Sequence, residues 1–555
     1  MAEIAVEGVP GPTRLRTVVA ASAAGTAFEW YDFFVFGSLT TVIQKTFFSG
    51  LPETAGIAAA LALFGAGFLF RPIGALVFGR IGDRVGRKGA FLITVTLMGG
   101  ATVAIGLLPS YAAVGILSPI LLLLMRIIQG FALGGEYGGA AIYVAEHAAM
   151  DARGRSTGWV QTSAAFGLFA ALLVILVTRL ALGAAAGPSA FDAWGWRVPF
   201  LFSAGLLAIS IWMRLKLSES PAFAAMKEAG EGSKAPYAEA FGQWPNLKIV
   251  LLALVAIMSA QGAVWYTAFF YVQTFLGTFL KVDQPTINTL LMAATAVSAV
   301  LYVVFGWLSD RIGRKPVMLA GMTLMLIAYF PGFHLLTATL NPALEEAQKA
   351  TPVTVIADPA DCSLQFDPIG KANFTSSCDI AKSLLANAGV SYRNEAGPPG
   401  QPAMVRIGLS TIQSLDARGA PKDVAKAIKG SIEGQIKEGL ARGGYPAKAD
   451  PKRMNLPGAF GVLLVFVIAA TALYGPIAAC LVELFPTRIR YTAMSLPYNI
   501  GTGWIGGFVP FTAFAIVAAV GDIYAGLWYP FAFTLVSVVT CLFLLPETKG
   551  RDLRR

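Results

Sequence analysis

The decapeptide GRIGDRVGRK at residues 79–88 returns as GWLSDRIGRK at residues 306–315, with Gly, Asp, Arg, Gly, Arg and Lys in the same register. A second pair supports this repeat: YGGAAIYVAE at 137–146 matches YGPIAACLVE at 474–483. Self-similarity of this kind indicates two homologous halves that fold alike. The charged segment 216–248 joins the two halves.

The composition places both halves in a membrane. Of the 555 residues, 56% are hydrophobic and 13% are charged, whereas roughly a quarter of a soluble chain is charged. A run of about 20 apolar residues crosses the hydrocarbon core as a helix, and a helix satisfies its own backbone groups there. The sequence predicts twelve such helices, at residues 17–43, 55–79, 89–109, 117–145, 157–181, 197–215, 249–280, 287–308, 316–338, 458–482, 492–518 and 525–545.

Basic residues set the predicted orientation, because the Lys and Arg residues of short connections stay on the cytoplasmic side. With the N-terminus inside, both decapeptides and most of the other basic residues of the short connections lie on that side. We therefore expect both termini to be cytoplasmic. The formal charge of +10 follows from this topology and from one extramembrane insert, so we expect no nucleic-acid partner.

Several motifs carry a resemblance to a known family. The doubled decapeptide resembles the signature loops of the major facilitator superfamily, and RIIQGFALGGE at residues 126–136 resembles its fourth-helix motif. With EWYDFF, FRPIGALVFG, GWRVPF and ELFPTRIRYT, the pattern is similar to the metabolite:H+ symporter family. The resemblance covers about the whole chain apart from residues 341–457. It implies an all-α membrane protein of the bacterial inner membrane, with twelve transmembrane helices in two pseudo-symmetric six-helix bundles.

We expect the domains to follow the repeat. An N-terminal bundle (1–215) and a C-terminal bundle (249–545) flank a cytoplasmic linker (216–248), and residues 546–555 form a cytoplasmic tail. A periplasmic insert, 341–457, interrupts the second bundle between helices 9 and 10.

Two acids in the first span suggest proton coupling. Glu29 and Asp32 lie about 60° apart on a helical wheel, and the second half has Val264 and Thr267 at their positions. Charge in a membrane costs a few kcal/mol, so charge kept in one half alone argues for a task beyond packing.

The fourth span supplies the expected partners of these acids. Arg126, Gln129 and Glu136 share a face there. Because burial favours a protonated carboxyl group and a guanidinium favours the ionised form, an acid that meets Arg126 in only one conformation would change its proton affinity during a cycle. We expect Asp32 or Glu29 to carry the proton, Arg126 to modulate it, and Glu136 to act as an accessory carrier or to orient the substrate. The alternative is a fixed structural network, and for Arg71 we favour that structural role.

The decapeptides predict a gate. Asp83 and Asp310 can accept hydrogen bonds from helix N-termini or arginines across the interface between the halves, and breaking these contacts would favour inward opening. The alternative is that the loops only anchor topology. The predicted gating residues are Gly79, Asp83, Arg84, Gly86, Arg87, Lys88, Gly306, Asp310, Arg311, Gly313, Arg314 and Lys315.

The expected function is proton-coupled symport of a small substrate by alternating access. Arg126 favours an organic acid, whereas an aromatic face such as that of Trp265 could hold a quaternary ammonium group. Osmolyte symporters of the resembled family often carry a long coiled-coil tail, and this chain stops at PETKGRDLRR. An organic acid (mono-, di- or tricarboxylate) therefore ranks first, and a zwitterionic osmolyte such as proline or betaine ranks second. The expected substrate contacts are Arg126, Gln129, Tyr137, Gln161, Gln261, Trp265, Tyr266, Tyr498 and Asn499.

The insert at residues 341–457 is expected to contain a disulfide and a surface helix. Cys362 and Cys378 should form a disulfide in an oxidising compartment, and the spacing of apolar residues predicts a surface helix at 421–440. A sensor or docking protein that uses the insert is one alternative function, and a facilitator without proton coupling is another.

Enzyme chemistry is not expected. GTGWIG at 501–506 lies in an apolar helix with no strand before it, which favours close helix packing over nucleotide binding. The two histidines, His147 and His334, have no Cys or carboxylate at ligand spacing. We expect no catalytic residue, no metal and no cofactor, with the substrate, protons and membrane lipid as partners of a monomer.

Overall fold

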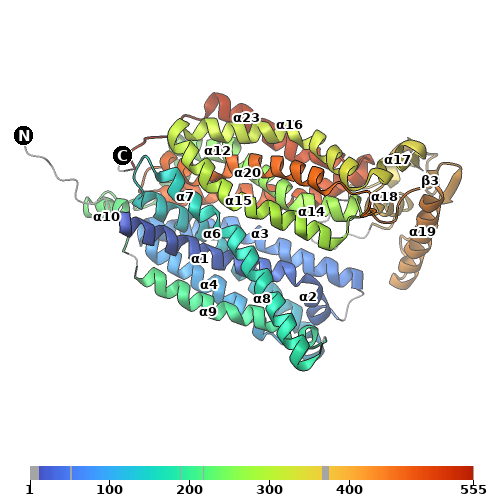
Figure 1. Cartoon of the computed structure of the whole chain (residues 1–555), viewed down its shortest axis with the longest axis horizontal. Helices are drawn as coiled ribbons and strands as arrows, with labels where there is room; N and C mark the ends of the chain where they lie inside the picture. The colour runs from blue at the N-terminus through green and yellow to red at the C-terminus, as the bar shows by residue number, and fades with distance from the viewer. Residues whose placement is uncertain (1–11, 50–52, 188, 217, 366–373, 554–555) are drawn as a thin grey trace, which may run out of the picture.

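The computed structural model describes residues 12–49, 53–187, 189–216, 218–365 and 374–553. Ten helical spans in this part of the chain are long and apolar enough to cross a membrane. The long helices α1 (Pro12–Ser38) and α3 (Glu53–Arg84) complete two groups of six. Figure 1 shows the two groups side by side, with the first half in blue to green and the second half in green to red.

The first half contains α1, α3 and four more spans. These are α4 (Arg87–Leu107), α6 (Leu117–His147), α7 (Arg153–Gln161) continued by α8 (Ser163–Ala186), and α9 (Arg197–Leu215). Short helices α2 (Thr40–Phe47) and α5 (Tyr111–Val114) lie in its connections. Between the halves the structure forms α10 (Pro221–Glu228) and α11 (Pro236–Gly242).

The seventh span starts at Trp244, five residues before the predicted start at 249, and ends at Phe279. It is built from α12 (Trp244–Ala253), α13 (Ser259–Tyr266) and α14 (Val272–Thr274), with π-helical turns between and after them. The remaining spans are α15 (Gln284–Ile312), α16 (Arg314–Leu340), α20 (Leu456–Leu484), α21 (Arg490–Asn499) continued by α22 (Val509–Val520), and α23 (Trp528–Leu544).

The two ends of the bundle differ. The end that carries both decapeptides, with α7, α10 and α12, is called the basic end, and the opposite end is called the insert end (Figure 1). Glycine lets the backbones of the two halves touch at the basic end, because a Cβ at Gly306 would lie 2.4 Å from the carbonyl oxygen of Gly154. A Cβ at Gly79 would likewise lie 2.8 Å from Cα of Thr492. The repeated first glycine of each decapeptide thus brings a helix of one half against a helix of the other.

The insert is a small α/β unit, which the sequence does not predict. It contains α17 (Pro342–Ala350), α18 (Ser377–Ala388), α19 (Lys422–Arg442) and four strands. The strands are β1 (Val353–Ala357), β2 (Tyr392–Ala396), β3 (Met404–Ile407) and β4 (Ser410–Gln413). They form one sheet in the order β2-β1-β3-β4, with β1 parallel to β2 and the other pairs antiparallel. Helix α19 confirms the surface helix predicted at 421–440.

Hydrogen bonds fix the insert to the second half. The backbone N–H of Tyr392 donates to the carbonyl oxygen of Gly521, which follows α22, at 2.6 Å. Asn394 Nδ2 donates to the carbonyl oxygen of Val520 at 2.8 Å, and Asn341 Nδ2 donates to that of Leu280 at 2.9 Å. The insert therefore holds the ends of the seventh, ninth and eleventh spans together.

Cys362 and Cys378 are joined by a disulfide that links the loop after β1 to the first turn of α18. The two cysteines are 16 residues apart in the sequence, and closing a loop of this size stabilises a fold by roughly 3 kcal/mol.

Removing this disulfide should loosen the insert and leave the bundle intact. In a Cys362→Ser/Cys378→Ser variant, we expect the amides of α18 to exchange with deuterium on the order of a hundredfold faster, since about 1.4 kcal/mol corresponds to a factor of ten. Hydrogen–deuterium exchange with mass spectrometry measures this, with the amides of α16 as the internal control. Unchanged exchange in α18 would show that the disulfide does not stabilise the insert.

Candidate functional site

Two glycines of the fourth-helix motif position the site. A Cβ at Gly130 would lie 2.0 Å from the carbonyl oxygen of Gly67, and a Cβ at Gly134 would lie 2.2 Å from that of Arg71. Because neither glycine has a side chain, α6 packs directly on the backbone of α3. Arg71 of α3 and Arg126 of α6 therefore line the same small hollow.

Glu29 of α1 is paired with an arginine that the sequence did not single out. Arg214 Nη2 donates to Glu29 Oε1 at 2.6 Å, and both side chains are buried. The guanidinium lies over the ring of Phe91 at 3.7 Å and against Gly25, where a Cβ would be 2.5 Å from Nη2. Gly25 thus leaves the space that the ion pair occupies.

Asp32 is also held by side chains of other helices. Ser203 of α9 donates a hydrogen bond to Asp32 Oδ1 at 2.6 Å, and Thr102 of α4 contacts the same carboxyl group. Thr102 Oγ1 in turn accepts a hydrogen bond from Gln129 Nε2 at 2.8 Å. Gln129 Oε1 accepts one from Arg126 Nη1 at 2.8 Å. Arg126 and Asp32 are therefore connected through Gln129 and Thr102.

Glu136 completes a cluster of three buried acids. It is 1% exposed, and neither carboxyl oxygen has a hydrogen-bond partner that meets normal geometry. Electrostatic interactions link it to Glu29, Asp32 and Arg214. Glu29 and Glu136 thus share the guanidinium of Arg214, and Asp32 adds a third carboxyl group beside them. Burying more than one uncompensated negative charge is costly, which favours a proton in this cluster.

Aromatic rings from both halves meet beside the acids. The rings of Trp30 and Trp265, which are related by the internal repeat, lie 5.9 Å apart. Trp265 Nε1 donates a hydrogen bond to Tyr302 Oη at 2.9 Å, and the hydroxyl groups of Tyr474 and Tyr498 are 2.7 Å apart. Tyr266 and Tyr498 are the second-half residues that line the hollow beside the acids, and Trp265 packs behind them against Trp30 and Tyr474.

A central hollow of about 40 Å³ lies between the acids and these rings. Its volume is that of one or two water molecules, so a substrate requires the halves to move apart. Its lining residues are Thr26, Glu29, Trp30, Phe33, Arg71, Leu133, Glu136, Tyr266 and Tyr498.

Arg71 links the first half to the second across this hollow. Its Nε donates to Asn499 Oδ1 of α21 at 3.2 Å, and it also interacts with Tyr266 of α13. Asn499 Nδ2 donates back to the carbonyl oxygen of Gly134 at 2.8 Å. Arg71 therefore joins the two halves and also places a positive charge at the hollow. The sequence analysis favours only the structural role for this residue.

The decapeptides hold the halves together at the basic end. Asp83 accepts hydrogen bonds from the backbone N–H groups of Tyr491 and Thr492, at 3.1 and 2.8 Å, at the start of α21. Asp310 accepts equivalent bonds from Gly154 and Arg155, both at 2.7 Å, at the start of α7. A carboxylate at a helix N-terminus is favoured by the helix dipole and by the free N–H groups there.

The other members of the two decapeptides have matching environments in the two halves. Asp83 pairs with Arg87 at 2.6 Å, and Asp310 pairs with Arg314 at 2.5 Å. Gly86 and Gly313 have φ of 133° and 111°, which glycine adopts readily. Lys88 and Lys315 donate to carbonyl oxygens at the ends of α9 and α23, whereas Arg84 and Arg311 are exposed.

Two ion pairs cross between the halves beside the decapeptides. Arg153 of the first half pairs with Glu483 of the second at 2.8 Å, and Arg490 of the second half pairs with Glu146 of the first at 2.5 Å. These four residues occupy repeat-related positions, so each half supplies one acid and one arginine. The basic end is closed by reciprocal contacts.

Some of the other predicted substrate residues lie at the central hollows, and others do not. Gln129 lies beside Arg126 in the adjoining hollow, and Asn499 holds Arg71. Gln161 and Gln261 are buried but do not line either central hollow. The side chain of Tyr137 lies outside the described part of the chain.

Sequence reasoning missed Arg214, Ser203 and Thr102. Arg214 lies in the last turn of an apolar span, where a basic residue marks the cytoplasmic end and gives no sign of a partner in the membrane. Only the packing of α9 on α1 brings it to Glu29. The partner expected for the acids, Arg126, reaches Asp32 through intermediate side chains instead.

Comparison with known proteins agrees with this architecture. The family model for sugar (and other) transporters matches residues 17–243 and 444–555, and that for MFS/sugar transport proteins matches residues 139–357. The chain belongs to the sugar (and other) transporter family, within the major facilitator superfamily of membrane transporters. It is an integral membrane transporter rather than an enzyme.

Curated relatives are similar to part of the chain. The glycine betaine/proline/ectoine/pipecolic acid transporter OusA of Dickeya dadantii is 36% identical over 59% of this chain and 66% of its own length. The proline/betaine transporter of Escherichia coli K12 is 35% identical over the same shares. The shikimate transporter of that strain is 34% identical over 60% of this chain and 75% of its own length. The chain thus spans about two thirds of the length of the first of these relatives.

Solved structures share the fold at low identity. The proton:xylose symporter XylE bound to 6-bromo-6-deoxy-D-glucose superimposes with a TM-score of 0.61 at 16% identity, covering 98% of both chains. A double-tryptophan variant of XylE gives a TM-score of 0.64 at 15% identity.

Removing Asp83 should open the basic end. Each hydrogen bond from a backbone N–H to a buried carboxylate contributes roughly 1.5–3 kcal/mol. Ser495 of α21 is buried against Gly138 of the other half, so a Ser495→Cys thiol reports opening. We expect Asp83→Ala to speed maleimide labelling of this cysteine at least about tenfold, equivalent to about 1.4 kcal/mol.

An exposed acid at the same end supplies the control. Asp151→Ala should leave the labelling rate unchanged, and the parent chain accounts for labelling of Cys480 and Cys541, which are buried. Equal labelling rates with and without Asp83 would show that this carboxylate does not hold the halves together.

We expect removal of the arginine and removal of one acid from this cluster to change the folding stability in opposite directions. Arg214→Met leaves the buried Glu29 and Glu136 without the cation that they share and should cost about 3–5 kcal/mol of folding stability. Glu136→Gln removes an uncompensated carboxyl group and should leave the Tm unchanged or raise it. Adding Glu136→Gln to Arg214→Met should recover part of the loss.

Thermal denaturation of the purified protein in detergent measures these changes. A Glu136→Gln variant that loses as much stability as Arg214→Met would show that Glu136 is a compensated structural group.

Proposed function

We propose that the protein is a proton-coupled symporter that imports a small zwitterionic osmolyte, of the betaine or proline type, by alternating access. The observation that carries this proposal is the central hollow, which is lined by aromatic rings, by the carboxyl groups of Glu29 and Glu136 and by the Arg71 guanidinium. A zwitterion needs both kinds of contact. The relatives named as proline and betaine transporters support the same substrate class.

The expected binding mode follows from the charges. The substrate carboxylate pairs with Arg71, whose planar guanidinium suits a carboxylate. The ammonium group lies against Trp30, Trp265 and Tyr266, where an aromatic face attracts a cation by about 0.5–2 kcal/mol. Glu29 and Glu136 line the same hollow and add to that attraction.

Proton coupling is assigned to the acid cluster. Glu29 is fixed by Arg214 and Asp32 by Ser203, while Glu136 lacks such a partner. A proton on Glu136, in contact with Glu29, relieves the repulsion between the two. When the substrate carboxylate pairs with Arg71, it neutralises a cation that lines the same hollow as Glu29 and Glu136. This favours the protonated forms of these acids, so proton and substrate bind together, as symport requires.

Alternating access uses the basic end as the inner gate. The basic end faces the cytoplasm in this proposal, since its short loops are rich in arginine and lysine. Its closure by Asp83, Asp310 and the two reciprocal ion pairs corresponds to a state closed toward the cytoplasm. Opening requires these contacts to break.

An organic acid is the second candidate substrate. Arg71 and Arg126 line adjoining hollows, and two cations of this kind suit a carboxylate-rich molecule. The shikimate transporter among the relatives favours it too. Arg126 is occupied by Gln129 and lies over Phe36 at 3.8 Å, so the aromatic hollow is the stronger observation.

Proteoliposomes that contain a pH-sensitive dye test the function. We expect betaine or proline to drive protein-dependent acidification of the lumen, and shikimate, acetate and citrate to give none above protein-free vesicles. Glu136→Gln should abolish the proton signal. Radiolabelled betaine entering without protons would support a facilitator, and a response to shikimate alone would establish the organic acid as substrate.

Binding of the ammonium group has its own variant pair. Trp265→Leu should raise the KM for betaine about 2- to 30-fold, the equivalent of a lost cation–π contact of about 0.5–2 kcal/mol. Trp159→Leu is the matched control, because Trp159 is 48% exposed on the outside of α7. Equal KM values for the two variants would show that Trp265 does not contact the substrate.

A further inference from the structure

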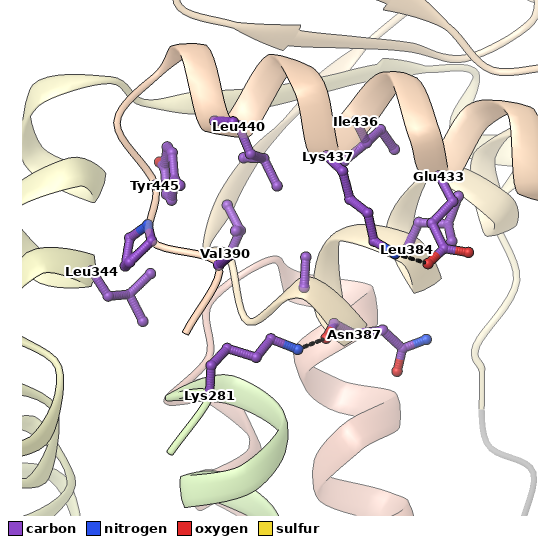
Figure 2. Close-up of a pocket in the computed structure, with 14 residues that line it drawn as sticks. Lys281, Leu344, Leu384, Asn387, Val390, Glu433, Ile436, Lys437, Leu440 and Tyr445 are labelled. Carbon is purple, nitrogen blue, oxygen red and sulfur yellow. Dashed lines mark hydrogen bonds and ion pairs between the residues drawn. The ribbon is translucent and has the colours of Figure 1, made fainter. Parts of the chain in front are cut away.

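A second cavity lies in the insert rather than in the central site. Its volume is about 440 Å³, which is within the range of small-molecule sites. Figure 2 shows α19 above it and the loop with Lys281 below it. Most of its lining is apolar, including Leu344, Val390 and Leu440.

Two lysines face this cavity from opposite sides. Lys281 belongs to the connection between the seventh and eighth spans, and Lys437 belongs to α19 (Figure 2). Lys281 Nζ donates to the carbonyl oxygen of Asn387 at 2.5 Å, and Lys437 pairs with Glu433 at 2.6 Å. Two cations and one acid leave one positive charge in the cavity wall.

The backbone at Lys281 is held in a costly conformation. Within the described residues it is the one non-glycine with positive φ, at 55°, and this conformation costs about 1–2 kcal/mol. Neighbouring bonds maintain it: Ala449 N–H donates to the Lys281 carbonyl oxygen at 3.1 Å, and Val282 N–H donates to that of Leu276 at 3.0 Å. Such strain persists at sites where a side chain must take a particular direction.

The electrostatic surroundings agree with the geometry. Burial in the cavity wall, together with the ammonium group of Lys437, holds the pKa of Lys281 below its usual range. An anion between the two lysines would relieve this repulsion. The other polar groups there are already engaged or neutral: Glu433 pairs with Lys437, and Tyr445 donates to the carbonyl oxygen of Thr351.

We propose that this cavity binds a small amphipathic organic anion, with its carboxylate between Lys281 and Lys437 and its apolar body against Leu344, Val390 and Leu440. A single negative charge neutralises the wall, and the apolar body explains why most of the lining is aliphatic. The site is separate from the central hollow and does not depend on the transported substrate. Because Lys281 joins two spans, the bound anion would bridge α19 to the transport bundle.

The full-length protein in detergent provides the test, with 4-fluorobenzoate as the probe. Fluorine NMR line broadening reports weak binding. We expect 4-fluorobenzoate to bind, and 4-fluorobenzyl alcohol and 4-fluorobenzylamine to bind at least tenfold more weakly. Protein-free micelles measure partition into detergent.

Variants assign the binding to the cavity. Lys281→Gly removes the ammonium group and adopts the positive φ without strain, so folding is retained, and Lys437→Met removes the second cation. Each should weaken 4-fluorobenzoate binding at least tenfold. Lys426→Met is the matched control, because Lys426 is exposed on α19 and does not line the cavity.

Three results would overturn the proposal. These are no binding to the parent protein at millimolar probe, equal binding to the parent and both cavity variants, and binding that Arg71→Met abolishes but Lys281→Gly leaves intact. The last result would place the probe in the central hollow.

Discussion

Two buried carboxylates fix how the halves of this transporter sit against each other. Asp83 and Asp310 each accept two backbone N–H groups at the start of a helix in the opposite half. A helix N-terminus with free N–H groups is the natural partner of an anion in a medium with little water. The central site lies on the same interface, where Trp30 meets Trp265 and Arg71 meets Asn499.

The closed basic end also explains why the central charges are unevenly compensated. The ion pairs at the basic end are reciprocal, and each acid there has an arginine or N–H partner. In the centre, Glu29 and Glu136 share Arg214, and Asp32 beside them is held by hydroxyl groups instead. A structural network would be expected to balance its charges, because an unpaired buried charge costs several kcal/mol. An imbalance that a proton and a cationic group can remove is suited to coupling their movements.

The insert belongs mechanically to the second half. Its bonds to residues beside the seventh, ninth and eleventh spans hold it to that half, so it should move with it during transport. Its α/β architecture was missed in the sequence because its strands are only four or five residues long. The run VTVIA at 353–357 is a strand signal after Pro352, but its partners β2 and β3 are assembled from distant segments.

The sequence by itself determined the number of spans, the pairing of the halves and the acidic first helix. Apolar run length and a repeated motif are local properties, and a membrane leaves helices as the solution for such runs. Only the tertiary structure decided which charges meet. Glu29 finds Arg214 rather than Arg126, because α9 packs on α1 beside Gly25, and Arg71 faces the site because Gly130 and Gly134 draw α6 onto α3. Such contacts depend on how each helix is rotated about its axis and on how closely two helices approach each other. The sequence of a single helix does not specify either.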